Sequence, residues 1–107
     1  MNRRLVYGSV AVALEVILLG GCQSRTAPPI TASFLKAGAR QKADARTLTE
    51  GRRVYVNRCV QCHALPMVAK YDPPRLKAIL AIMSGRASLS PEQHDAVQKY
   101  LLTVRSQ

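Results

Sequence analysis

Hydrophobic and polar positions in the C-terminal half of the chain repeat with helical spacing. In residues 90–105, Ser90 is placed as a helix cap, Pro91 takes the first helical position and Gln93 completes a capping box. Apolar residues then recur three and four positions apart, at Ala96, Val97, Tyr100, Leu101 and Val104. The pattern predicts an amphipathic helix that ends near Arg105, where a positive charge suits the helix dipole.

A second apolar stripe lies just before this segment. Asp72 is a candidate cap and Pro73 a candidate first helical residue. The stripe itself follows the spacing i, i+3, i+4 and i+7, at Leu76, Ile79, Leu80 and Met83. We therefore expect a helix from Pro73 that ends at Gly85, a residue type common at C-terminal caps.

A third helix is predicted to begin at Thr47, because Thr47 and Glu50 have the spacing of a capping box, and to run to about Arg58. Gly51 and Tyr55 are four positions apart and so share one face of this helix. Glycine inside a helix costs up to about 1 kcal/mol relative to alanine. We expect the close approach of a second helix at Gly51 to offset that cost.

No segment alternates with a period of two over a useful length, so the sequence predicts an all-α domain without a sheet. Three helices within residues 47–107 enclose only a thin core. At roughly 25 cal/mol per Å² of buried apolar surface, such domains have almost no net stability without an added staple. We therefore expect a buried prosthetic group to contribute to the fold.

The N-terminal segment is typical of an export signal. Arg3 and Arg4 precede the mostly apolar run 5–19, although Glu15 is unfavourable inside it. The residues before Cys22 resemble the lipobox of bacterial lipoproteins, which implies that residues 1–21 are removed and that lipid is attached to Cys22. The alternatives are a chance cysteine near a cleavage site and a short membrane anchor.

The stretch 22–46 follows this signal and is rich in Ala, Pro, Ser, Lys and Arg. Residues 33–46 suit a partial helix, but no apolar stripe there is long enough to require burial. We therefore divide the chain into a signal peptide (1–21), a lipid-anchored flexible tether (22–46) and a helical domain (47–107). In a host with two membranes, Gln23 in place of the aspartate that often retains lipoproteins in the inner membrane favours the outer membrane.

Positive charge dominates what remains after the signal. Without residues 1–21 the chain has 14 Lys and Arg residues and 5 Asp and Glu residues, a side-chain charge of about +9. Such a surface attracts anionic lipids, nucleic acids or acidic protein faces, and export makes nucleic acid an unsuitable partner. We expect membranes and redox proteins with acidic docking faces, the alternative being a surface that only keeps the protein soluble.

The run Cys59-Val60-Gln61-Cys62-His63 has the spacing of the c-type haem attachment motif. Two cysteines three positions apart can reach the two vinyl groups of one haem, and the histidine that follows is delivered to the iron. A redox dithiol is an alternative, but it requires a βαβ surround that the pattern does not predict. A structural zinc site with His94 as fourth ligand is another.

The motif together with Gly51, Tyr55 and the final helix that carries Tyr100 resembles the class I cytochrome c family over residues 47–105. The resemblance implies a small domain of about three helices packed around one covalently attached haem. It also implies that the helix predicted from Thr47 crosses the helix predicted to end near Arg105. Gly51 and Tyr55 would then meet Val97, Tyr100 and Leu101.

In this family the second axial ligand is normally a methionine, and Met67 and Met83 are the candidates. Met67 follows His63 by only four residues, a reach too short to pass round the haem edge at about 3.5 Å per residue. Met83 is therefore the expected distal ligand. The alternatives are that Met83 belongs to the core, that His94 ligates iron, or that there is no sixth ligand.

With His63 and Met83 on the iron, the resemblance implies a periplasmic one-electron carrier with haem c, and neither an enzyme nor a binder of small-molecule substrates. Arg75 or Lys77 would then suit the haem propionates, and Tyr71 a hydrogen bond. Two alternatives remain, a haem c subunit of a larger redox complex and a five-coordinate haem sensor or catalyst.

Overall fold

The computed structural model describes residues 27–59 and 68–107, and within these ranges the secondary structure is helical, with no β-strand. The elements are α2 (Ala32–Ala39), α3 (Ala45–Val54), the π-helical turn η1 (Tyr55–Cys59), the 3₁₀ turn η2 (Val68–Lys70), α4 (Pro73–Arg86) and α5 (Pro91–Arg105). The expectation of a helical domain without a sheet is confirmed for this part of the chain. The predicted signal, residues 1–21, lies outside it.

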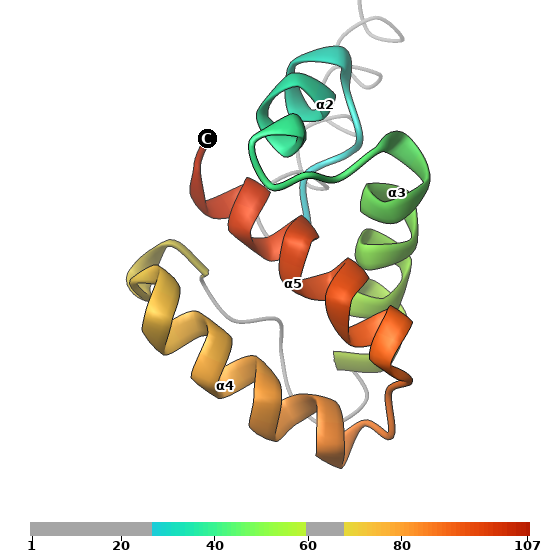
Figure 1. Ribbon diagram of the computed structural model, residues 1–107, viewed down its shortest axis with the longest axis vertical. Helices are drawn as coiled ribbons and strands as arrows, with labels where there is room; N and C mark the ends of the chain where they lie inside the picture. The colour runs from blue at the N-terminus through green and yellow to red at the C-terminus, as the bar shows by residue number, and fades with distance from the viewer. Residues whose placement is uncertain (1–26, 60–67) are drawn as a thin grey trace, which may run out of the picture.

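Helix α5 is the centre of the arrangement. It packs against α2, α3, α4 and η2, with its largest contact on α3. Figure 1 shows α2 and α4 at opposite ends of the molecule, with α5 running between them. The start of α5 is as predicted: Ser90 accepts a hydrogen bond from the Gln93 backbone N–H, and the Gln93 side chain accepts one from the Ser90 N–H.

The contact between α3 and α5 occurs at Gly51, as expected. A Cβ atom on Gly51 would lie 2.7 Å from the Cβ of Tyr100 and even closer to the carbonyl oxygen of Ala96. No ordinary side chain fits in that space, so the helix tolerates the entropic cost of glycine because the two backbones approach closely here. The expected meeting of Gly51 with the last helix is confirmed.

The predicted start of this helix at Thr47 is wrong. Helix α3 begins at Ala45, and its cap is Asp44, whose carboxylate accepts a hydrogen bond from the Thr47 N–H at 2.8 Å. Glu50 does not complete a capping box; its carboxylate pairs with the Arg53 guanidinium. Aspartate is a strong helix cap. Because the Asp44 carboxylate already accepts a hydrogen bond from a free N–H of the first turn, the helix begins before Thr47.

Helix α4 begins as predicted and ends later than predicted. Asp72 caps it with a bond from the Arg75 N–H to its carboxylate, and Pro73 is its first residue. The helix continues through Gly85 to Arg86. It is Ser88 that adopts the left-handed backbone conformation, with φ of 52°, while the Leu89 N–H donates to the Ser84 carbonyl.

The expectation that residues 22–46 contain nothing that requires burial is also wrong. Helix α2 lies within this stretch, and its Phe34 is only 1% exposed, with its ring centre 5.4 Å from that of Tyr100. Phe34, together with the close approach of Gly38 to Leu48, holds one face of this short helix against the domain, a signal that a search for an extended apolar stripe misses. Helix α2 is therefore packed on the domain. Residues 22–26 lie outside the described part of the chain, so a tether there stays a prediction.

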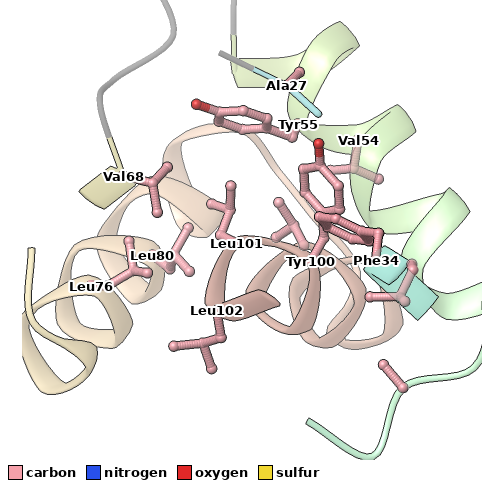
Figure 2. Packing of buried hydrophobic residues seen from close by; sticks show 13 residues of the cluster. Ala27, Phe34, Val54, Tyr55, Val68, Leu76, Leu80, Tyr100, Leu101 and Leu102 are labelled. Carbon is pink, nitrogen blue, oxygen red and sulfur yellow. The ribbon is translucent and has the colours of Figure 1, made fainter. Parts of the chain in front are cut away.

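Three aromatic rings form the part of the core nearest α2 and α3 (Figure 2). Tyr100 lies between Phe34 and Tyr55, with its ring centre 6.1 Å from that of Tyr55. Its hydroxyl donates a 2.8 Å hydrogen bond to the Pro28 carbonyl, and Arg52 donates to the carbonyls of Pro28 and Ala27. The start of the described chain is thereby fixed against α3 and α5.

Replacing Gly51 with alanine should lower the stability of the protein by about 1–3 kcal/mol or more, because the added methyl group must push α3 and α5 apart. Gly85→Ala is the matched control, since a Cβ there meets nothing within 4 Å. The control should be neutral or stabilising by up to about 1 kcal/mol. Thermal unfolding followed by circular dichroism measures both, and equal effects would contradict the proposed role of Gly51.

Candidate haem pocket

An apolar pocket of about 360 Å³ lies between η1, α4 and α5. Ligand and cofactor pockets commonly measure about 300–1,000 Å³. Its apolar lining comes from the inner stripe of α4, from α5 and from η2: Leu76, Ile79, Leu80, Leu101 and Val68. Figure 2 shows four of these side chains, those of Val68, Leu76, Leu80 and Leu101, gathered between α4 and α5.

Two sulfur-bearing side chains from different elements also line this pocket. Cys59 is the last residue of η1, so the π-helical turn that continues α3 brings it to the pocket edge. Met83 lies in the last turns of α4, on the same stripe as Leu76 and Leu80, and is half-buried. The structure therefore brings together two of the residues singled out in the sequence, although they belong to different helices.

Two arginines complete the wall, and sequence reasoning missed both. Arg58 immediately precedes Cys59, and its guanidinium donates a hydrogen bond to the carbonyl of Ala87, the residue that caps α4. Arg86 lies one helical turn after Met83 and also lines the pocket. Their positions relative to Cys59 and Met83 are the signal that could have identified them. They give an otherwise apolar pocket a positively charged margin.

Tyr55 and Tyr71 are the phenols of the pocket. Burial raises the pKa of Tyr55 well above its usual value, and the neighbouring Cys59 adds to the rise, so this phenol stays protonated at all ordinary pH values. The ring of Tyr71 lies beneath the Arg75 guanidinium at 5.8 Å, and its carbonyl accepts a 2.6 Å hydrogen bond from Arg105. These contacts attach the segment before α4 to α5.

The remaining predicted residues fall into two groups. Cys22, Cys62, His63 and Met67 lie outside the described residues, so their roles stay predictions. Arg75 and Lys77 are exposed on α4 and do not line the pocket, whereas Tyr71 does.

His94 is half-buried and engaged with a neighbouring helix. Its Nδ1 lies 2.5 Å from the Ser84 hydroxyl, on the residue next to Met83. Its side chain does not line the pocket. His94 is therefore a partly buried residue bonded to Ser84 and lies outside the pocket lining.

Residues 27–59 and 68–107 contain no group of three or more His, Cys, Asp or Glu side chains that could hold a metal ion. The same ranges contain no helix long and apolar enough to cross a membrane. Comparisons of the whole chain with protein-family models, with curated proteins and with solved structures found no match.

The chemistry of the pocket fits the group that the sequence motif implies. A haem has a flat apolar ring with acidic propionates at one edge and iron at its centre. The walls offer an apolar surface, a thiol at the first position of the attachment motif, a thioether and two guanidinium groups. The thioether of a methionine is a soft donor suited to haem iron, and a cysteine thiol in such a motif can form a covalent thioether link to the ring.

The hydrogen bond between Ser84 and His94 should stabilise the end of α4, because Ser84 is only 8% exposed and depends on protein partners. His94→Ala is expected to cost about 1–3 kcal/mol, the penalty for leaving a buried polar group unpaired. A double-mutant cycle with Ser84→Ala, measured by denaturant unfolding, isolates the pair. Additive effects of the two substitutions would show that the contact contributes nothing.

Proposed function

We propose that this chain is a small exported one-electron carrier that holds one covalent haem c in the pocket between η1, α4 and α5. The observation that supports it best is that Cys59 and Met83 line the same apolar pocket. Cys59 is the first cysteine of the attachment motif, and Met83 is the methionine whose distance along the chain allows it to reach the opposite side of a bound group.

The residues of the pocket have separate tasks in this proposal. Cys59 and Cys62 would hold the haem through thioether links, and His63 and Met83 would bind its iron. The bound group would supply the one-electron chemistry. Leu76, Leu80 and Leu101 exclude water, and ligation by histidine and methionine raises the reduction potential.

Arg58 and Arg86 are the charged groups suited to the propionates, because both line the pocket whereas Arg75 and Lys77 do not. A guanidinium presents paired N–H donors that match a carboxylate. The hydrogen bond from Arg58 to the Ala87 carbonyl also connects the cysteine-bearing turn to the end of α4. A chain that binds the haem edge through these two arginines would hold both walls of the pocket together.

The function also includes a location and a class of partner. With lipid on Cys22, the protein would be anchored to a membrane and would face the periplasm. Its electron donors and acceptors would be proteins with acidic faces, since opposite charge raises the rate of encounter. Contacts between redox proteins are characteristically small and weak, which permits rapid exchange.

Met83→Leu tests the distal ligand while nearly preserving side-chain volume. We expect the ferric holoprotein to lose the weak far-red absorption typical of methionine-bound haem. The reduction potential should fall by on the order of 0.1 V, since axial ligands tune haem potentials over about 0.8 V. Met67→Leu is the matched control and should change neither property.

Loss of the far-red band in Met67→Leu would show that Met67, and not Met83, binds the iron. Absence of the band in the unsubstituted protein, with rapid binding of added cyanide or carbon monoxide, would contradict the carrier and favour the five-coordinate alternative. Purification from the native membrane as a stoichiometric complex would instead identify a subunit of a larger enzyme.

The combined change Cys59→Ser and Cys62→Ser should remove the haem and with it much of the structure. The core of a small domain rarely supplies more than about 3–5 kcal/mol of net stability. In this protein the pocket occupies part of the space between α4 and α5 that a core would fill. We expect a large loss of far-ultraviolet helical signal and rapid proteolysis in the exporting cell. A doubly substituted chain that stays helical and unfolds cooperatively would show that the haem does not stabilise the fold.

A further inference from the structure

The basic end of the molecule around α2 has no role in the pocket. Residues 27–43 include three basic side chains and no acidic one, and all three are exposed: Lys36, Arg40 and Lys42. Lys36 and Arg40 are four positions apart and so lie on one face of the helix and its cap. The acidic residues Glu50, Glu92 and Asp95 line a different surface, between the first turns of α3 and α5.

The chain enters the folded part beside this basic end. Pro28 accepts hydrogen bonds from Tyr100 at 2.8 Å and from Arg52 at 3.2 Å, and Ala27 is only 5% exposed. Phe34 of α2 packs on the same Tyr100 ring. The fixed start of the described chain and the first turn of α2 therefore meet at one side chain.

The length of chain before Ala27 limits how far the domain can move from an anchor. Cys22 precedes Ala27 by five residues, which span at most about 18 Å when fully extended. A lipid on Cys22 would therefore hold the α2 end within that distance of the membrane surface.

We propose that the exposed basic face of α2 and its following turn, residues 36–42, docks on anionic lipid headgroups. This inference rests on the proposed lipidation of Cys22. Lys36, Arg40 and Lys42 supply the charge complementarity, and the short connection to Cys22 supplies the proximity. Basic residues beside an anionic membrane surface each strengthen binding roughly five-fold.

The orientation of the haem pocket follows from this contact. Helix α4 forms one wall of the pocket and lies at the end of the molecule away from α2 (Figure 1). A domain docked through α2 would therefore turn α4 and the pocket toward the aqueous phase. The redox partner would approach from that side, and the lipid would not compete with it.

The test uses the lipidated holoprotein in vesicles of phosphatidylcholine alone or of equimolar phosphatidylcholine and phosphatidylglycerol. A spin label is attached at Ala39→Cys, at the end of α2, or at Ala78→Cys, on α4; both alanines are exposed and helical. A nickel-chelating lipid relaxes labels near the surface. Relaxation at position 39 should increase severalfold with phosphatidylglycerol, and relaxation at position 78 should not change.

Charge substitutions distinguish docking through the basic face of α2 from a general attraction of the basic protein to anionic lipid. Lys36→Gln, Arg40→Gln and Lys42→Gln together should abolish the effect of phosphatidylglycerol at position 39. The matched control, Lys70→Gln, Arg75→Gln and Lys77→Gln, removes the same residue types from exposed positions on the α4 side and should preserve it. Equal effects of the two triple substitutions, a stronger signal at position 78, or no dependence on lipid charge would each overturn the proposal.

Two measurements on the unsubstituted protein detect failure of the proposed function separately. The mass of the mature N-terminus reports lipidation of Cys22, and a reduced-minus-oxidised spectrum reports haem c. If lipid is absent, co-sedimentation with the same vesicles replaces the relaxation measurement. Loss of the three α2 charges should then weaken binding by roughly two orders of magnitude, and an unchanged affinity would overturn the docking face.

Discussion

The close approach of α3 and α5 at Gly51 is the contact on which the rest of the structure depends. Without a Cβ on Gly51, the backbone of Ala96 and the side chain of Tyr100 lie directly against α3. Tyr100 can then meet Phe34 on one side and Tyr55 on the other. A separation of the two helices would therefore disturb α2, the fixed segment at Pro28 and the turn that carries Cys59.

The same contact gives the pocket its walls. Tyr55 is buried next to Tyr100, and the π-helical turn that it begins ends at Cys59. On the other side of α5, Leu101 faces Leu76 and Leu80 of α4, which places Met83 within the same lining. Helix α5 thus transmits the position of α3 to the pocket, and the hydrogen bond from Arg58 to the Ala87 carbonyl joins the turn of Cys59 directly to the end of α4. A π-helical turn at a functional residue is a recurrent feature of helical proteins.

Local sequence signals predicted the parts of the fold in which one strong feature acts alone. The capping box at Ser90, the cap at Asp72 and the close approach at Gly51 were all readable. Errors arose where two signals compete within a few residues, as with Asp44 and Thr47, or where tertiary packing overrides a pattern, as with Phe34. In the pocket, the motif pointed to Cys59, and the family resemblance with the reach of the chain pointed to Met83. Arg58 and Arg86 lie close to these residues in sequence, but only the folded chain shows that both arginines line the same pocket.

The arrangement suits the proposed function, because an anchored electron carrier has two separate requirements. An anchor should hold the protein near a membrane, yet the redox centre must stay accessible to a partner that binds briefly. Here the basic residues of α2 and the fixed segment at Pro28 lie at one end, and α4 with Met83 lies at the other (Figure 1). Between them stands α5, whose buried Tyr100 and Leu101 connect the two ends through continuous packing. A substitution at either end can therefore change one requirement without changing the other, provided that the contact at Gly51 stays intact.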